Sequence, residues 1–353
     1  MAPARILIVC SQNFLVVDPL KKAFAKIGAE VHHFNYHINH WFDRYFIHFI
    51  NKQSHNLRVL PKDRSLFEGH PLSHLQFRGQ KLLERIDEVA PDLILMIRGQ
   101  RFTEEVLRKA RARSRLFGWY IEAEEEAEHI FGEVNLFDHY FFISPACTDK
   151  ARNRGFRNVS VLRHSVDTEA YYPIDAPKRY DWCFVGSWAA QRQEYIERAI
   201  SVSRNGAVCG PRWLRKNFRN PIFHKIVKGR YARGEELLRL YGESKVILNV
   251  TNWGFGGGMD RSGVNQRVLE IPACRAALLT DSSRDLYELV EPGKHVIAYD
   301  GIRDFAEKLS HFIRNDVERE EIARAGYHEV TSRYSYHDTF RLLLDRYEEV
   351  SQP

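Results

Sequence analysis

The sequence lacks the patterns that mark membrane-spanning and disulfide-bonded proteins. No apolar run approaches the roughly 18 residues that a membrane-spanning helix needs. The first residues lack the charged, apolar and small-residue sections of a secretion signal. The five cysteines include no CxxC pair, which is typical of buried thiols in a reducing compartment. We therefore expect a cytoplasmic protein. The cysteines are Cys10, Cys147, Cys183, Cys209 and Cys274.

Two familiar phosphate-binding motifs and a metal-ligand set are also missing. The glycine run at 256–258 is not GxGxxG, because Met259 stands where the last glycine would be, and no GKS or GKT follows it. Six of the 16 histidines lie within 32–59. His37 and His40 have ligand-like spacing, but no compact set of His, Cys and carboxylate follows, so we expect no metal site. This aromatic, weakly basic segment is either an ordinary surface helix or one that faces an acceptor or a membrane.

Acidic residues are absent from residues 204–233. Because the whole chain has a net charge of +6 and this segment carries nine basic residues, the rest of the chain has a net charge of −3. A solvated surface could explain the segment, but an anionic partner is favoured: a nucleotide, a lipid headgroup or nucleic acid. Without helix-turn-helix, zinc-finger or RNP patterns, we do not expect nucleic acid. The basic residues are Arg204, Arg212, Arg215, Lys216, Arg219, Lys225, Lys228, Arg230 and Arg233.

The rest of the chain alternates strand and helix patterns. A hydrophobic content of 44% with 28% charged residues indicates a globular protein, and 353 residues suffice for two domains. In the first half, helix signals include Asp18 with Pro19, Gly28, and the cap Thr103. Strands that alternate with helices predict a parallel sheet covered on both faces. Strands are expected at 5–10, 30–36, 93–97, 116–122, 139–144 and 159–164.

The alternation breaks at residues 164–181, where two prolines and clustered polar residues suggest a linker. A second series follows, with strands expected at 245–251, 276–280 and 295–300. We therefore predict an α/β protein with two doubly wound Rossmann-like domains facing a cleft. The expected domains are residues 1–172 and 173–335, with a C-terminal helix at 336–353 that packs back on the first domain.

A glycine-rich loop and a helix with a buried-looking carboxylate follow the strand at 245–251. Ligands of such sheets bind beyond the carboxyl ends of the strands. Gly257 and Gly258 would let backbone N–H groups approach a diphosphate, and a helix at 264–273 would point its N-terminus there. Glu270 could then accept hydrogen bonds from ribose hydroxyls. The alternative is a mobile loop and a pairing of Glu270 with Arg267.

The segment "NQRVLEIPACRAALLTD" (265–281) resembles a motif of glycosyltransferases with the GT-B fold, and it is most similar to the CgeB-like group of family 4-type enzymes. The resemblance continues to about residue 345. It also covers "HSVDTEAYYP", similar to the interdomain segment of these enzymes, and "DWCFVGSW", similar to the first strand and loop of their nucleotide-binding half. It implies that 1–172 binds the acceptor and 173–335 binds the nucleotide sugar.

The resemblance also implies roles for individual residues. The ribose-binding glutamate of the family falls on Glu270, and the asparagine and arginine at the helix start fall on Asn265 and Arg267. Gly186 matches the loop glycine. Two diphosphate ligands of the family correspond to Ser187, which replaces an arginine, and to Arg192.

Other positions depart from the family pattern. The second glutamate of the family is replaced by Ser262, and Asp260 is a candidate substitute. Arg261 is a candidate for the missing diphosphate cation. Arg275 stands where the family has a glycine, and nothing in the sequence explains this change. The end of the strand near 206–209 is expected close to the base, so Gly210 and Arg212 are further donor-binding candidates.

The sequence is best interpreted as a glycosyltransferase in polysaccharide biosynthesis that uses a UDP- or GDP-linked sugar and needs no metal or other cofactor. The expected acceptor is a glycan, a lipid-linked molecule or another hydroxyl compound. The protein is expected to make peripheral contact with the inner face of an anionic membrane. The alternatives are a non-catalytic protein that binds an anionic ligand or nucleic acid, and a GT-B-fold sugar-nucleotide epimerase.

An inverting enzyme would need a general base near the acceptor hydroxyl. Glu122 ends an expected strand and is one candidate, although it also belongs to the acidic run "EAEEEAE". His164 is the other candidate, and an ordinary structural role remains the alternative. A retaining enzyme would need neither residue, and the sequence leaves the stereochemistry open.

Overall fold

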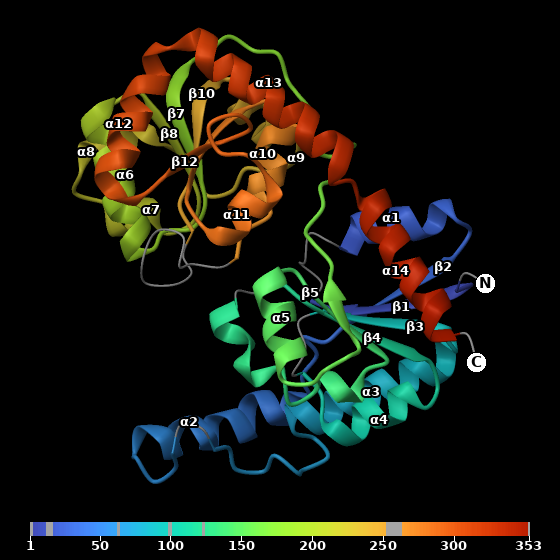
Figure 1. Ribbon diagram of the computed structural model, residues 1–353. Helices are drawn as coiled ribbons and strands as arrows, with labels where there is room; N and C mark the ends of the chain where they lie inside the picture. Colours follow the sequence, from blue (N-terminus) through green and yellow to red (C-terminus); the bar gives the residue numbers. More distant parts are fainter. Residues whose placement is uncertain are drawn as a thin grey trace. The chain divides into compact units, whose positions relative to one another are not determined.

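A computed structural model describes residues 3–11, 17–61, 64–97, 101–121, 124–251 and 263–351. The chain forms two compact units. The N-terminal unit contains Met1–Arg163 and Phe340–Pro353, and the C-terminal unit contains His164–Thr339. Each unit is a parallel sheet with helices on both faces (Figure 1), as the alternating pattern predicts.

The N-terminal sheet has six parallel strands in the order β2-β1-β3-β4-β5-β6. Their sequences are continuous apolar runs because both faces of the sheet are covered. The order reverses at β1, so the space beyond the carboxyl ends of β1 and β3 is the switch point where such sheets bind ligands. The strands are β1 Arg5–Cys10, β2 Glu30–Asn35, β3 Leu93–Ile97, β4 Arg115–Tyr120, β5 His139–Phe142 and β6 Val159–Val161.

Local signals set several helix ends in this unit. The side chain of Thr103 accepts a hydrogen bond from the Val106 amide and caps α4, as its sequence position predicts. Gly28 has a φ of +82° just after α1, where a side chain would be strained. The helices are α1 Val17–Lys26, η1 Asp43–Ile47 (a π-helical turn), α2 His48–Asn56, α3 His74–Val89, α4 Glu104–Arg111, η2 Glu124–His129, η3 Val134–Leu136 and α5 Pro145–Asn153.

The C-terminal sheet also has six parallel strands, in the order β12-β11-β10-β7-β8-β9. The first strand of this unit, β7, lies between β10 and β8. The switch point of the sheet is therefore beyond the carboxyl ends of β7 and β10. The strands are β7 Tyr180–Val185, β8 Gly206–Cys209, β9 Val227–Gly229, β10 Ser244–Asn249, β11 Ala277–Asp281 and β12 Ile297–Tyr299.

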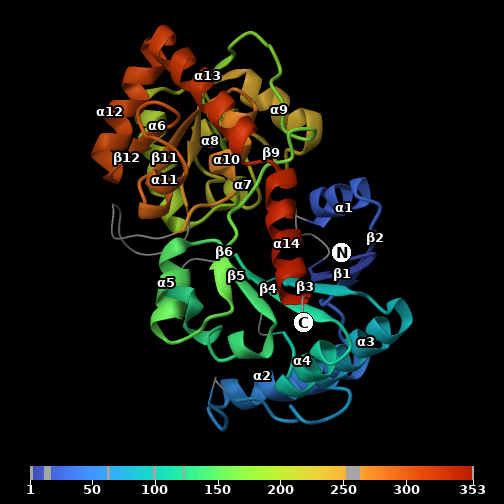
Figure 2. The same ribbon diagram turned by 45° about the vertical axis from the view of Figure 1, so that its right-hand side comes forward.

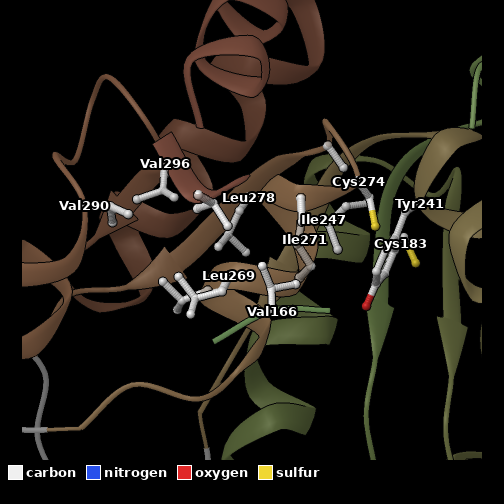
Figure 3. Close-up of a cluster of buried hydrophobic side chains, with 14 of the residues drawn as sticks. Val166, Cys183, Tyr241, Ile247, Leu269, Ile271, Cys274, Leu278, Val290 and Val296 are labelled. Atoms are coloured by element: carbon white, nitrogen blue, oxygen red, sulfur yellow. The ribbon is translucent and has the colours of Figure 1, made fainter. Parts of the chain in front are cut away.

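Two hydrophobic clusters cover the two faces of this sheet, because successive side chains of a strand point to opposite faces. Cys183, Ile247 and Leu278 belong to the cluster under α9, α10 and α11 (Figure 3). Trp182 and Val246 belong to the cluster on the opposite face, which packs against α6, α8 and α12. The helices are α6 Ala190–Val202, α7 Trp213–Lys216, α8 Pro221–Ile226, α9 Gly234–Gly242, α10 Arg267–Ala273, α11 Arg284–Leu289, α12 Gly301–Arg314 and α13 Asp316–Arg333.

The last helix, α14 (Tyr336–Ser351), begins in the C-terminal unit and continues into the N-terminal unit (Figure 2). Within the N-terminal unit, the ring of Phe340 meets the ring of Phe24 on α1 edge to face, with 4.5 Å between centroids. All five cysteines are buried free thiols, as expected. In the described part of the chain, every helix is too short or too polar to cross a bilayer.

Candidate functional site

Two candidate residues are tied to the end of β10 by separate hydrogen bonds. Arg192, in the first turn of α6, donates its Nε–H to the carbonyl of Val250 at 3.0 Å. Asn265, just before α10, donates from Nδ2 to the Oδ1 of Asn249 at 3.0 Å, and its own Oδ1 accepts the Arg267 amide. These bonds bring residues from α6 and from the start of α10 to the switch point of the C-terminal sheet.

Arg192 is buried, and its side chain has internal partners. Its Nη1 donates to the carbonyl of Ser187 at 3.0 Å and to the Oγ of Ser187 at 3.3 Å. Burial lowers the pKa of Arg192 to about 10, and the nearby positive charge of Arg267 contributes to this lowering. Arg192 therefore holds the loop after β7 against β10, and it places a second cation close to Arg267.

Glu270 lies in the first turn of α10, because the helix begins at Arg267 and not near residue 264 as the sequence suggested. Its side chain is only 7% exposed. Burial raises the pKa of the Glu270 carboxyl, while the charge of Arg267 and a hydrogen bond from the Tyr171 hydroxyl act in the opposite direction. Arg267 thus acts on Glu270 through its charge. Ribose binding by Glu270 and its pairing with Arg267 both stay predictions from the sequence.

One of the two loop glycines has a structural reason to be glycine. Gly186 follows β7 and Gly210 follows β8. A Cβ on Gly210 would lie 1.9 Å from the carbonyl oxygen of Gly186, far inside van der Waals contact. The Gly186 carbonyl also accepts a hydrogen bond from the indole of Trp213 at 2.8 Å. Close backbone approach therefore explains Gly210 without a ligand.

All nine cations of the basic segment 204–233 are exposed. Of the aromatic residues in this segment, Phe218 and Tyr231 are exposed, but Trp213 and Phe223 are fully buried in the core. Arg212 adopts a φ of +71° before α7, a conformation that is uncommon for residues other than glycine. A pocket of about 510 Å³ lies there, lined by Gly210, Arg212, Trp213, Leu214, Arg215, Val227, Lys228, Gly229 and Arg230.

Several predicted site residues lie outside the described part of the chain. This group contains one candidate base and the loop that was expected to approach the diphosphate. Their roles stay predictions from the sequence. The residues are Glu122, Gly257, Gly258, Asp260 and Arg261, together with Ser262.

His164 is the first residue of the C-terminal unit and is buried. Burial lowers the pKa of its imidazole to about 4, and its Nδ1 has no hydrogen-bond partner among the described residues. The imidazole is therefore neutral at physiological pH, as a general base must be. Within the described ranges, no group of three His, Cys, Asp or Glu side chains is arranged to hold a metal ion.

The sequence did not single out the tyrosines around Glu270. Tyr171 belongs to the interdomain segment, and Tyr336 begins α14. The carboxylate of Glu270 raises the pKa of both hydroxyls, in each case after burial as the larger cause. Tyr336 also accepts a hydrogen bond from Gln266 at 3.0 Å. The quoted motif "HSVDTEAYYP" contains Tyr171, but nothing local predicts that it meets a residue about a hundred positions away.

Two doubly wound sheets, with candidate residues gathered at the switch point of the second, define the architecture of GT-B proteins. Residues 191–345 match the family model described as glycosyl transferase-like. The chain is 22% identical over 267 residues to the spore protein CgeB of Bacillus subtilis, covering 72% of this chain and 82% of CgeB. The resemblance to GT-B glycosyltransferases and to the CgeB-like group is therefore confirmed.

Solved structures agree on the fold. TarM has a TM-score of 0.68 at 9% identity, with 98% of each chain covered. A mutant form of S. aureus TarM, solved with fondaparinux, α-GlcNAc-glycerol and UDP, has a TM-score of 0.59 at 12% identity. The match covers 76% of our chain and 59% of the TarM chain. Anabaena HepE, solved with UDP-glucose, has a TM-score of 0.66 at 14% identity, covering 98% and 99% of the two chains. The GT-B fold is thus shown.

Proposed function

We propose that the protein is a glycosyltransferase that moves a sugar from a nucleotide-diphosphate sugar to a hydroxyl group of an acceptor. One observation carries this proposal: the hydrogen bonds of Arg192 and Asn265 to consecutive residues at the end of β10. They gather two cations, an amide and the carboxylate of Glu270 where sheets of this kind bind nucleotides. The glycosyl transferase-like match over 191–345 includes all of these residues.

In the proposed donor site, Glu270 accepts hydrogen bonds from the ribose hydroxyls, and the cations Arg192 and Arg267 face the diphosphate. The acceptor hydroxyl oxygen attacks the anomeric carbon and gives its proton to a general base or to the leaving phosphate, while the bond from that carbon to the β-phosphate oxygen breaks. The nucleoside diphosphate leaves with the electron pair, and fixed cations stabilise its growing negative charge. This supply of positive charge is why we propose that the reaction needs no metal ion.

We propose that the nucleotide base enters the pocket beside Gly210 and Arg212. The pocket lies at the ends of β8 and β9, next to the switch point, and it is large enough for a nucleobase at about 510 Å³. Four cations line it: Arg212, Arg215, Lys228 and Arg230. A UDP-linked hexose is the proposed donor, since TarM and HepE were solved with UDP or UDP-glucose.

The N-terminal unit is proposed to bind a glycan or lipid-linked acceptor. TarM was solved with a glycan and with a glycerol-linked sugar, which supports an acceptor of this kind. His164 and Glu122 stay the candidates for a general base. A sugar-nucleotide epimerase of the same fold is the second candidate, and product analysis without an acceptor would reveal its product.

Peripheral contact with an anionic membrane is proposed at two exposed surfaces. The basic segment 204–233 supplies cations with Phe218 and Tyr231 among them. In the N-terminal unit, Trp41, Tyr45, Phe46 and Phe49 of the segment that includes η1 and α2 are all exposed. Aromatic side chains beside cations suit the headgroup region of a bilayer. This contact would place the protein at the inner face of a membrane.

Nucleotide binding tests the proposed function directly. We expect the protein to bind UDP or GDP in calorimetry and Glu270→Ala to abolish this binding, because two charge-assisted hydrogen bonds of about 1.5–3 kcal/mol each are lost. Glu235→Ala is the matched control, since Glu235 is an exposed residue of the same unit that pairs with Arg239. If Glu270→Ala binds the nucleotide with unchanged affinity, Glu270 does not bind the ribose.

A further inference from the structure

Two arginines and a tyrosine meet at the carboxyl end of the N-terminal sheet. Tyr36 directly follows β2, Arg101 follows β3, and Arg78 lies on α3, which packs on β1 and β2. Because β1 lies between β2 and β3, Tyr36 and Arg101 flank the end of β1. This is the switch point of the N-terminal sheet, where doubly wound domains bind ligands.

The two guanidinium groups converge on one ring. The Cζ of Arg78 lies 5.9 Å from the centroid of the Tyr36 ring, and the Cζ of Arg101 lies 5.4 Å from it. Arg78 also donates from Nη1 to the carbonyl of Arg101 at 3.2 Å. Tyr36 is 1% exposed and Arg78 is 8% exposed, whereas Arg101 is open to solvent. One cation is thus held inside the unit, and it positions the backbone of the other.

This arrangement is electrostatically costly. Burial lowers the pKa of Arg78, and the charge of Arg101 lowers it further. Among the described residues, neither arginine forms an ion pair with a carboxylate; Asp43 acts on Arg78 only from a distance and accepts the amide of His74 instead. The Nε–H of Arg78 is buried without a hydrogen-bond partner in the described part of the chain.

We propose that Arg78 and Arg101 form an anion-binding site for a carboxylate, phosphate or sulfate group carried by the acceptor sugar. Guanidinium groups bind such oxyanions through paired hydrogen bonds. A bound anion would offset the repulsion between the two cations and give buried donors an acceptor. The assignment to an acceptor rests on the proposed glycosyltransferase function, while the anion site itself does not. The acceptor is therefore an anionic glycan rather than a neutral one.

The site is tested by titrating the intact protein with glucuronate, inorganic phosphate and inorganic sulfate, with glucose as the neutral probe. The titrations are done with saturating UDP, so that the donor site does not contribute. We expect the anions to bind and glucose not to bind. Arg101→Gln should weaken anion binding at least tenfold. Arg78→Lys keeps the charge but loses the fork of donors, and it should weaken binding to a similar degree.

Arg85→Gln is the matched control. Arg85 lies on the same helix, α3, and forms a surface ion pair with Glu88 at 2.6 Å, so its replacement should leave anion affinity unchanged. Among the three anions, the tightest binder identifies whether the acceptor carries a carboxylate, a phosphate or a sulfate.

Equal anion affinity of Arg101→Gln and the wild type would overturn the site. Loss of anion binding on saturation with UDP would overturn it as well, because the anions would then occupy the donor site. Failure of the wild type to bind any nucleotide would instead count against the proposed function, and anion binding that depends on Arg101 would still be measurable without UDP.

Discussion

The hydroxyl of Tyr171 donates a hydrogen bond to the buried carboxylate of Glu270. The two residues come from the interdomain segment and from α10. A carboxylate in this position can accept hydrogen bonds from both ribose hydroxyls only while it is ionised, and burial disfavours the ionised form. The hydrogen bond from Tyr171 and the charge of Arg267 favour the ionised form. Tyr171 is therefore a positioning residue for the proposed donor site.

Tyr171→Phe should make nucleotide binding more sensitive to acid. Without the hydroxyl, the pKa of Glu270 rises above its already raised value, so the carboxylate is lost at a higher pH. A hydrogen bond to a charged group is worth about 1.5–3 kcal/mol, which corresponds to a shift of about one pH unit or more. We expect this upward shift in the pH dependence of the Kd for UDP, with affinities near wild type at high pH. Tyr172→Phe, at an exposed neighbour, should behave as wild type; a uniform loss of affinity at every pH would indicate a purely structural role.

Glu270→Gln should stabilise the protein while it weakens donor binding. Burial raises the pKa of Glu270 above 4.5, so the folded state holds the proton more tightly than the unfolded chain does. Ionisation therefore destabilises the fold as the pH rises from 4.5 through the raised pKa, and the full penalty is present above it. In urea unfolding we expect the variant to exceed wild type at pH 8 and to match it at pH 4. A less stable variant at pH 8 would show that the carboxylate contributes favourable contacts that outweigh its burial.

Acid should destabilise the C-terminal unit through His164. Its pKa is lowered from 6.5 to about 4 by burial, so the unfolded chain takes up a proton near pH 6.5 and the folded state only near pH 4. Stability should fall between these values, by up to about 1.4 kcal/mol per pH unit. His164→Gln should reduce this slope, and His337→Gln, at an exposed histidine of the same unit, should not. Identical slopes in both variants would assign the acid sensitivity elsewhere.

Sugar transfer should survive saturating EDTA. The proposed donor site has the cations Arg192 and Arg267 where other enzymes place a divalent metal ion, and fixed positive charge can stabilise a leaving diphosphate without one. The measurement is the rate of nucleoside diphosphate release with and without chelator. Complete loss of activity that Mn²⁺ or Mg²⁺ restores would reject this arrangement and revive the histidine-rich segment at 32–59 as a metal site.

Anionic liposomes should sediment the protein at low salt and release it above about 0.3 M salt, where exposed charges are screened over a few Å. Arg215 and Lys228 line the pocket proposed for the base, so the test replaces other exposed cations of the basic segment. Replacing four of these cations by Gln should weaken sedimentation without changing UDP affinity. The four residues are Lys216, Arg219, Lys225 and Arg233. The exposed aromatic surface of the N-terminal unit is tested in the same assay by replacing Trp41, Tyr45 and Phe49 with Ala. Equal sedimentation with neutral and anionic liposomes would contradict an electrostatic contact.

Local sequence patterns predicted the fold class, and the motif resemblance named the candidate residues of the proposed donor site. Strand β3 lies at 93–97 as predicted, and Thr103 and Gly28 mark helix ends, because apolar periodicity, caps and glycine conformations act over a few residues. The motif at 265–281 pointed to Asn265, Arg267 and Glu270, and the structure places the first beside the end of β10 and the others at the start of α10.

The packing of distant elements against one another sets which residues meet. Three contacts join residues from different helices, strands and loops. Tyr171 bonds to Glu270, and Arg192 bonds to Val250. Arg78 and Arg101 converge on Tyr36. Such contacts depend on how whole elements pack, which no local pattern encodes. The hydrogen bond from Asn265, just before α10, to Asn249 of β10 is another such contact. The close approach of Gly210 to Gly186 likewise became visible only when β7 and β8 were paired.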